Sequence, residues 1–262
     1  MTGLTKTNEL LHPDEPEPLE VFNPDGASEF VIICEHAGRL IPRSLGTLGL
    51  SEEDRKRHIA WDIGARDIAV ALSGLLDAPL FMQRYSRLVC DCNRQPDVAS
   101  FAPDLSEWTE IPGNRDLSVK EIELRRAEIF DPFHDGVAKA LDTRETQNRR
   151  TFLVTIHSFT PTFKGVSRPW EIGVLFNRDR HFSPAIVEYL QQTTDYCVGV
   201  NEPYAVSDNT DYAIPVHGEQ RNIPCVEFEI RNDLTESDGA AAHWARLIAA
   251  SVVHASAKIA PL

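Results

Sequence analysis

The chain has 262 residues, of which 42% are hydrophobic and 25% charged, so it can build an ordinary globular core. Its formal net charge of -14 argues against a general nucleic-acid or anionic-membrane binder, because such proteins need a basic face. An anionic small molecule stays possible as a partner, since a local group of arginines can override the overall field. We therefore expect a small-molecule partner, with no nucleic acid and no membrane.

The cysteines and the first residues indicate a cytoplasmic protein. The five cysteines are odd in number and form no C-x-x-C motif, so buried free thiols are the simplest expectation. The opening stretch, MTGLTKTNELLHPDEPEPLE, lacks the basic start and apolar segment of a signal peptide. No apolar run reaches about 18 residues, so no transmembrane helix is expected.

The predicted elements alternate between strands and helices after an acidic, proline-rich arm over residues 1–27. The expected strands are 30–34, 79–83, 88–92, 151–156, 171–176, 196–200 and 224–230. The expected helices are 51–58, 63–76, 118–144, 183–193 and 239–258. This alternation predicts one α/β domain over residues 28–262, with helices around a mostly parallel or mixed sheet.

Two segments of this pattern stand out. The helical region 118–144 begins with a capping box, Ser118-x-x-Glu121, and is expected to break or kink near Pro132. The segment 96–115 is long, irregular and rich in proline, and loops of that length often cover a site.

Polar side chains stand at the ends of several predicted strands. Glu35 and His36 directly follow the first strand, His157 follows "TFLVTI", and Glu229 and Arg231 close "VEFEIR". In open α/β sheets, ligands bind at the carboxyl edge of the strands. The sequence therefore predicts that these residues surround a site.

Further candidates lie in the connecting segments. Asp62 stands in "HIAWDIGA" at a helix start, His58 lies four residues before it, and His217 lies on a glycine-containing loop. The segment "SRLVCDCNR" supplies four more candidates, which are Arg87, Asp91, Asn93 and Arg94. The chain has no G-x-S-x-G elbow, P-loop or G-x-G-x-x-G motif.

Histidines together with a carboxylate are the usual ligands of catalytic zinc, which keeps one position open for water. A glutamate outside the metal shell can take the proton of that water, and arginines can bind a substrate carboxylate. His36 and His157 are far apart in the chain, so no short metal motif supports this interpretation.

Five stretches, "EHAGRLIP", "WDIGARDIA", "SRLVCDCNR", "TIHSF" and "VEFEIRND", occur in this order and resemble the N-formylglutamate amidohydrolase family. The resemblance covers roughly residues 28 to 255. More distantly, the chain is similar to the zinc carboxypeptidases and to the aspartoacylase and succinylglutamate desuccinylase group. The resemblance implies a three-layer α/β/α sandwich with a mixed, mostly parallel central sheet.

The resemblance also implies a reaction, the hydrolysis of an N-formyl group from an acidic amino acid such as N-formylglutamate. A divalent metal, with zinc as the first expectation, is held by His36, Asp62 and His157. Glu229 is expected as general base, and His217 is expected near the substrate. The residues expected to bind the substrate carboxylate are Asn93, Arg94, Arg87 and Arg231.

One position departs from the carboxypeptidase-like pattern, which has His-x-x-Glu after the first strand. Here Arg39 takes the place of that acid, so Asp62 or Glu35 has to replace it. Asp62 is alternatively an N-cap of the following helix, and Glu35 alternatively orients a histidine.

The general base and one of the arginines each allow a second interpretation. Glu227 can be the base in place of Glu229, and Arg87 with Asp91 can be a structural ion pair. The remaining histidines, 12, 134, 181, 243 and 254, are expected to be ordinary. Two different functions also fit the sequence, a non-enzymatic binder of an anionic small molecule and a zinc hydrolase of another N-acyl amino acid or peptide.

Overall fold

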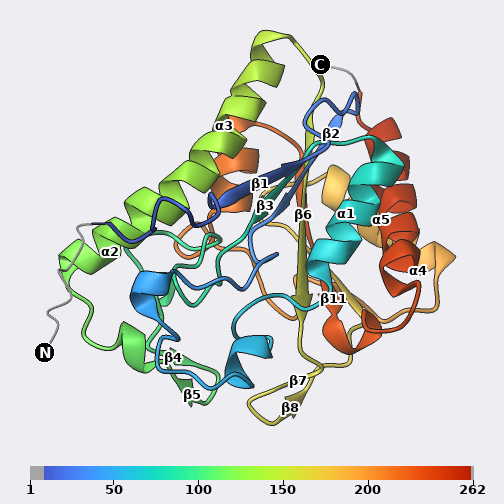
Figure 1. The fold of residues 1–262 in the computed structure, drawn as a ribbon. Coiled ribbons are helices and arrows are strands. Elements are labelled where there is room, and N and C mark those ends of the chain that lie inside the picture. Colours follow the sequence, from blue (N-terminus) through green and yellow to red (C-terminus); the bar gives the residue numbers. More distant parts are fainter. Residues whose placement is uncertain (1–8, 261–262) are drawn as a thin grey trace, which may run out of the picture.

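The computed structural model describes residues 9–260, which are built around a seven-stranded sheet (Figure 1). The strands lie in the order β1-β3-β2-β6-β11-β9-β10. Their bounds are β1 Leu19–Phe22, β2 Phe30–Cys34, β3 Leu80–Gln83, β6 Phe152–Phe159, β9 Ile172–Leu175, β10 Val198–Val200 and β11 Cys225–Arg231. The strands β3, β2, β6 and β11 are parallel, whereas β1 and the β9–β10 pair run antiparallel to them. The predicted mixed, mostly parallel sheet is thus confirmed.

Helices cover both faces of this sheet. In Figure 1, α2 and α3 lie on one side of the strands, and α1, α4 and α5 lie on the other. The bounds of these helices are α1 Ala65–Leu76, α2 Val119–Arg125, α3 Asp131–Thr146, α4 Phe182–Thr193 and α5 Ala240–Ala257. This arrangement is the three-layer α/β/α sandwich that the resemblance implied.

The strand β11 shows how the sequence assigns its side chains to the two faces. Val226, Phe228 and Ile230 are fully buried in the core shared with α1, α4 and α5. Glu227 and Glu229 alternate with them and face the other side, as expected for the two-residue period of a strand. The sheet therefore keeps one face apolar while it brings two carboxylates toward the site.

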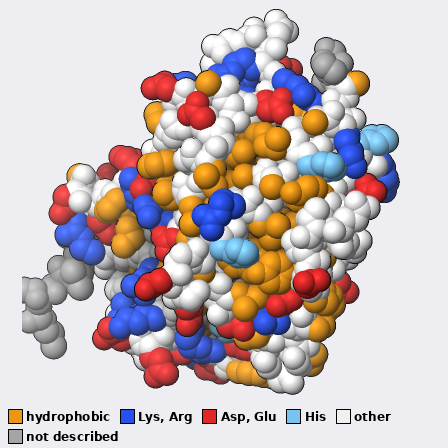
Figure 2. Space-filling model, turned by 90° about the vertical axis from the view of Figure 1, so that its right-hand side faces the viewer, with side chains coloured by type: hydrophobic (Ala, Val, Ile, Leu, Met, Phe, Trp, Pro, Cys, Tyr) orange, Lys and Arg blue, Asp and Glu red, His pale blue; other side chains and the backbone are white. Residues whose placement is uncertain are grey.

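The outer surface of α1, α4 and α5 is unusually apolar. Figure 2 shows hydrophobic side chains gathered over this side of the molecule. Two hydrophobic residues of these helices, Leu75 of α1 and Val253 of α5, are about half exposed. Within residues 9–260, no helix is long and apolar enough to cross a membrane.

The strand β1 corrects the expectation of a loosely ordered arm over residues 1–27. Residues 1–8 lie outside the described residues, but Leu19–Phe22 pair with β3 at the edge of the sheet. Leu19 also packs close to Gly136 of α3, where a Cβ atom would lie 2.2 Å from the leucine side chain. The prolines and acids around this short strand obscured its pattern.

One expected strand is wrong, and one expected helical region is confirmed. Residues 88–92 form a buried turn rather than a strand, in which the amide of Val89 donates to the carbonyl of Ser86 at 2.9 Å. The capping box at Ser118 is present, and the chain stays helical from α2 into α3. The two helices are joined by a π-helical turn over Arg126–Phe130, directly before Pro132, where the irregularity was expected.

Two small hairpins lie beyond the carboxyl ends of the parallel strands, at the bottom of Figure 1. The first consists of β4 (Leu105–Ser106) and β5 (Thr109–Glu110), inside the irregular segment that was expected to cover a site. The second consists of β7 (Thr162–Phe163) and β8 (Val166–Ser167), and it directly follows β6. Both hairpins contribute residues to the pocket described below.

Candidate active site

Three segments bring His36, Asp62 and His157 together at the carboxyl edge of the sheet. His36 follows β2, His157 lies near the end of the neighbouring β6, and Asp62 precedes α1. The amide of Asp62 donates to the carbonyl of His36 at 3.0 Å. The backbone after His36 passes close to the backbone of Arg84, and only glycine fits at position 38, because a Cβ atom there would lie 2.1 Å from the carbonyl oxygen of Arg84.

The three side chains present one atom each to a common point. Nδ1 of His36 lies 3.1 Å from Nδ1 of His157, and Oδ2 of Asp62 lies 3.3 Å from the first and 2.9 Å from the second. All three residues are 2% exposed. Tetrahedral zinc with ligands near 2.0–2.1 Å separates them by about 3.3 Å, so the observed spacing suits a small divalent ion.

The outer nitrogens of both histidines face carboxylates. Nε2 of His36 lies 2.6 Å from Oδ1 of Asp91, and Nε2 of His157 lies 3.1 Å from Oε2 of Glu35. A carboxylate at Nε2 favours the proton on that nitrogen and leaves Nδ1 as a lone pair. When both rings are neutral in this tautomer, two lone pairs and a carboxylate oxygen converge on one point. The donor set therefore fits a metal ion, which the His36–Asp62–His157 cluster can hold.

The pKa shifts of His157 and Asp62 also indicate a site that favours a cation. Burial alone lowers the pKa of His157, but the carboxylates of Glu227 and Glu35 outweigh burial and raise that pKa well above its usual value. Burial alone raises the pKa of Asp62, yet His36 and His157 lower it strongly. The site thus concentrates carboxylates around two imidazoles, which is an environment that favours a cation.

Asp62 and Glu35 occupy different positions in this cluster. The N-cap residue of α1 is Gly64, without a side-chain cap, so Asp62 does not serve as the helix cap. Its Oδ2 instead accepts from the amide of Ser158 at 3.2 Å and faces the histidines. Glu35 lies at the outer nitrogen of His157, where it can orient that ring. The geometry therefore favours Asp62 as the carboxylate ligand.

Glu229 and Glu227 lie next to the cluster with different surroundings. Glu229 is in register with His157 on the adjacent strand, and within residues 9–260 its buried Oε2 has no hydrogen-bond partner. Oε2 of Glu227 instead lies 3.3 Å from Nδ2 of Asn93 and 3.5 Å from Oγ1 of Thr155. Burial raises the pKa of Glu229 well above its usual value. Of the two, Glu229 is the carboxylate that is free to act.

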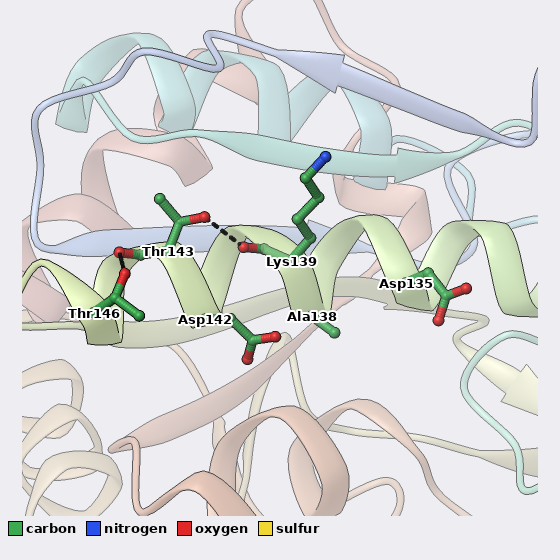
Figure 3. Close-up of a pocket in the computed structure, with 6 residues that line it drawn as sticks. All are labelled: Asp135, Ala138, Lys139, Asp142, Thr143 and Thr146. Carbon is green, nitrogen blue, oxygen red and sulfur yellow. Dashed lines mark hydrogen bonds between the residues drawn. The ribbon is translucent and has the colours of Figure 1, made fainter.

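A cavity of about 340 Å³ opens above these residues. Its lining includes His36, His157, Glu229, Arg87 and Arg94, and also His58, which was expected near the site. Volumes of this size match small-molecule sites. A second hollow, of about 440 Å³, is lined by α3 alone, and Figure 3 shows that its side chains extend from successive turns of that helix. Of these two, the first cavity brings groups from several segments together, including the histidines and Asp91.

Two predicted residues take part in ion pairs at the pocket wall. Nη2 of Arg87 lies 2.7 Å from Oδ2 of Asp91, and its Nη1 lies 3.3 Å from Oδ1 of Asp62. The alternative of an Arg87–Asp91 pair is confirmed. Nη1 of Arg94 lies 2.6 Å from Oδ1 of Asp211. Both arginines line the cavity, but carboxylates of the chain already neutralise them.

Asn93 lies in the same segment and also lines the cavity. Its Oδ1 accepts from the amides of Tyr212 at 3.2 Å and Ala213 at 3.1 Å, and its Nδ2 faces Glu227. Both ends of the amide are therefore engaged. The observed contacts assign Asn93 to holding the loop beside the pocket rather than to gripping a substrate.

The structure does not bring Arg231 into the cavity. Its Nε lies 2.9 Å from Oδ1 of Asp233, and Nη1 points to the carbonyls of Pro169 and Trp170. Arg231 is the last residue of β11, so its side chain reaches past the strand end toward a different loop. The expectation of a substrate contact does not fit this position.

His217 also lies away from the cavity lining, contrary to expectation. Its Nε2 lies 2.9 Å from Nδ1 of His134, whose Nε2 lies 2.8 Å from the carbonyl of Cys92. Both histidines are nearly fully buried. His134 was expected to be ordinary, and the partner that makes it otherwise lies 83 positions away in the chain.

The sequence analysis also missed several residues that line the cavity, and Lys164 and Tyr204 are two of them. Gly165 after Lys164 is a turn signal, and it marks the β7–β8 hairpin. Tyr204 has no local signal, because only the fold brings its loop beside β11 and β6.

Comparisons with known proteins agree with this geometry. A family model for N-formylglutamate amidohydrolase matches residues 28–235. The crystal structure of gene product Atu2144 from Agrobacterium tumefaciens is 36% identical, with a TM-score of 0.92 over 95% of this chain and 98% of that chain. The N-formylglutamate amidohydrolase from Ralstonia eutropha JMP134 is 17% identical and shares the fold, with a TM-score of 0.66 over 93% of this chain and 98% of that chain.

No curated protein matches the chain. The family model nevertheless spans most of the sequence, and it includes the strands and loops that build the pocket. The chain therefore belongs to the N-formylglutamate amidohydrolase family, a family of hydrolases that act on an amide C–N bond other than a peptide bond.

Proposed function

We propose that this chain removes the N-acyl group of a small acidic N-acyl amino acid such as N-formylglutamate, with a divalent metal ion at His36, Asp62 and His157. Zinc is the first candidate, because two imidazoles and one carboxylate are a common set of ligands for catalytic zinc. One observation carries the proposal. The unpaired Oε2 of Glu229 lies beside a buried set of convergent metal-ligating atoms.

The ligands are held in place from outside. Asp91 faces the outer nitrogen of His36, and Glu35 faces that of His157, so each ring is fixed with Nδ1 toward the common point. A metal ion held there would polarise the amide carbonyl of the substrate and would lower the pKa of a bound water to about 7. Arg87 pairs with Asp91 and so stabilises one of these orienting carboxylates.

Glu229 moves the proton in this proposal. Its Oε2 accepts a proton from the attacking water and returns it to the nitrogen of the leaving amine. Burial raises the pKa of Glu229, and a base works best when its pKa lies near the operating pH. Glu227 is the weaker candidate because Asn93 and Thr155 lie at its Oε2.

Arg94 is the proposed partner of the substrate α-carboxylate. Asp211 holds Nη1 of Arg94, which leaves other N–H groups of the guanidinium for a carboxylate in the cavity. The cavity of about 340 Å³ suits a small N-acyl amino acid better than an extended peptide. Family membership and the free carboxylate favour hydrolysis over simple binding of an anion.

The proposal is tested by formate release from N-formyl-L-glutamate, with protein purified without a metal-affinity tag. We expect turnover by the wild type and a loss of about 10²- to 10⁴-fold in Glu229→Gln, the range of general-base catalysis. Glu188→Gln, on the outer surface of α4, is the matched control and keeps full activity.

Two outcomes contradict parts of the proposal. If Glu229→Gln keeps its turnover, the base lies elsewhere. If the wild type binds N-formylglutamate but releases no formate after zinc is added, the chain is a binder rather than a hydrolase. Release of another acyl group in preference to formyl keeps the mechanism and changes the substrate.

A further inference from the structure

The cavity contains many acidic groups and few free cations. Arg87 is neutralised by Asp91 and Asp62, and Arg94 by Asp211. A substrate with two carboxylates needs a second cationic partner besides Arg94, because a buried anion is costly unless it is paired. The question is which part of the pocket wall provides that partner.

The turn of the β7–β8 hairpin places a lysine at the cavity. Lys164 and Gly165 have φ angles of 49° and 78°, as in a two-residue hairpin turn with both central residues left-handed. Lys164 lines the cavity, and its Nζ lies 5.4 Å from the ring centre of Trp108 in the other hairpin. Among residues 9–260, no carboxylate pairs with this ammonium group.

A second cation lies just behind the same wall. Arg168 is 8% exposed, and in the described part of the chain it has no carboxylate partner. Its guanidinium stacks 4.7 Å from the ring centre of Phe163 and 4.8 Å from that of Tyr204, two residues that line the cavity. Buried arginines are normally paired with an acid, so the unpaired charge of Arg168 favours the binding of an anion nearby.

The hydroxyl of Tyr204 links this arginine to the cavity. Nη1 of Arg168 lies 3.0 Å from Oη of Tyr204. Because a guanidinium only donates, Oη accepts this bond, and the phenolic hydrogen is free to donate to a ligand. Burial and the neighbouring Glu229 raise the pKa of Tyr204, so the hydroxyl keeps its hydrogen at neutral pH.

We propose that Lys164 and Tyr204, with Arg168 behind them, form a subsite for the side-chain carboxylate of the substrate. Lys164 supplies the charge, Tyr204 donates a hydrogen bond, and Arg168 positions the hydroxyl of Tyr204. Arg94 keeps the α-carboxylate, which lies one carbon from the scissile nitrogen and so has to stay near the metal cluster. This inference rests on the proposed function and makes the enzyme selective for N-acyl derivatives of dicarboxylic amino acids.

The test compares N-formyl-L-glutamate with N-formyl-L-glutamine, which has the same shape but a neutral side chain. We expect the wild type to prefer the glutamate. We expect Lys164→Gln and Tyr204→Phe each to raise KM for the glutamate about 10- to 100-fold, as for a lost hydrogen bond to a charged group. The KM for the glutamine substrate stays nearly unchanged in Lys164→Gln. In Tyr204→Phe it rises less than the KM for the glutamate, because the carboxamide oxygen accepts the same O–H in a neutral and weaker hydrogen bond. The kcat for both substrates stays nearly unchanged.

Matched controls separate a local effect from a general one. Lys139→Gln removes an exposed lysine on α3, and Tyr196→Phe removes a phenol that bonds His243 far from the pocket. Both controls keep the wild-type preference. Arg168→Lys is expected to raise KM for the glutamate only, and its melting temperature shows whether the buried position is still packed.

The outcomes distinguish this inference from the proposed function. Equal efficiency of the wild type on both substrates, or equal loss on both in Lys164→Gln and Tyr204→Phe, overturns the subsite and leaves the hydrolase intact. If the wild type hydrolyses neither substrate, calorimetric binding of the two compounds to the wild type and Lys164→Gln decides the subsite by itself. A weaker glutamate affinity in the variant supports it, and an unchanged affinity overturns it.

Discussion

Two buried histidine pairs in this molecule look alike and serve different purposes. Nδ1 of His36 lies 3.1 Å from Nδ1 of His157, and Nδ1 of His134 lies 2.9 Å from Nε2 of His217. In the second pair, His134 donates from Nε2 to the carbonyl of Cys92, so its Nδ1 accepts the N–H of His217. In the first pair, the outer nitrogens face carboxylates, and both inner nitrogens lie beside Oδ2 of Asp62.

The neighbours, rather than the ring spacing, decide what each pair can do. Burial and His217 lower the pKa of His134, and burial and Arg221 lower that of His217 to about 4, so this pair stays neutral. The His36–His157 pair has Asp62 at its centre, and a cation satisfies its converging atoms. The second pair is joined by a hydrogen bond, and the first belongs to a cluster that can hold a metal ion.

The largest expected effect comes from breaking the first pair. In His157→Ala the metal has only two ligands, so we expect loss of stoichiometric metal and a fall in kcat/KM on the order of 10³-fold. Elemental analysis and formate release measure both quantities. His134→Ala, in the other pair, keeps the metal. Full metal content in His157→Ala contradicts the assignment of the ligands.

A smaller effect is expected from Asp91, the carboxylate that orients His36 from outside. Asp91→Asn weakens this orientation, and we expect metal affinity to fall about 10- to 100-fold, as for comparable outer partners of metal ligands. Competition with a chromogenic chelator gives the affinity. Asp233→Asn, whose partner Arg231 lies outside the cavity, serves as the control. An unchanged affinity in Asp91→Asn shows that the outer contact does not tune the site.

The layers of the fold follow from local pattern, but its edges do not. The continuous apolar run Phe30–Cys34 and the alternating apolar and acidic residues of β11 predicted the centre of the sheet, because both patterns are typical of strands. The short strand Leu19–Phe22 was missed, since its pairing with β3 depends on residues about 60 positions away. The apolar run 88–92 has the pattern of a strand, although its burial comes from core packing without a strand partner.

The candidate site shows the same limit. Residues at strand ends, such as His36, His157 and Glu229, were found because parallel strands collect their carboxyl ends at one edge. The partner of His217 could not be predicted, because nothing near His134 in the sequence marks it. The ion pair of Arg94 with Asp211 could not be predicted either, since the two residues lie 117 positions apart. Spacing reveals which residues can meet, and only the fold shows which charges are already neutralised.

The second pair predicts a stability effect without a metal effect. His217→Leu removes the N–H that His134 accepts and leaves a buried Nδ1 without a partner, so we expect unfolding free energy to fall by about 1–3 kcal/mol. Urea unfolding measures the change, and metal content stays at the wild-type level. His243→Leu, whose bond to Tyr196 is exposed, costs little by comparison. A large loss of metal in His217→Leu contradicts the prediction that only the His36–His157 pair contributes to the metal site.

The smallest expected effect is a pH dependence that belongs to the second pair alone. Both histidines have lowered folded-state pKa values, that of His217 falling to about 4 from an ordinary 6.5. As the pH falls below 6.5, both histidines bind protons in the unfolded chain but not in the folded one. The free energy of unfolding therefore decreases with falling pH, until the histidines are also protonated in the folded chain. Each such histidine contributes a slope of up to about 1.4 kcal/mol per pH unit in that window.

The double variant His134→Leu/His217→Leu has no such groups, and its unfolding free energy should vary less between pH 6.5 and 4. The metal cluster is common to both proteins, so its own acid sensitivity cancels in the difference between the two curves. Equal slopes mean that the pair takes up protons while folded, which contradicts the lowered pKa values of His134 and His217.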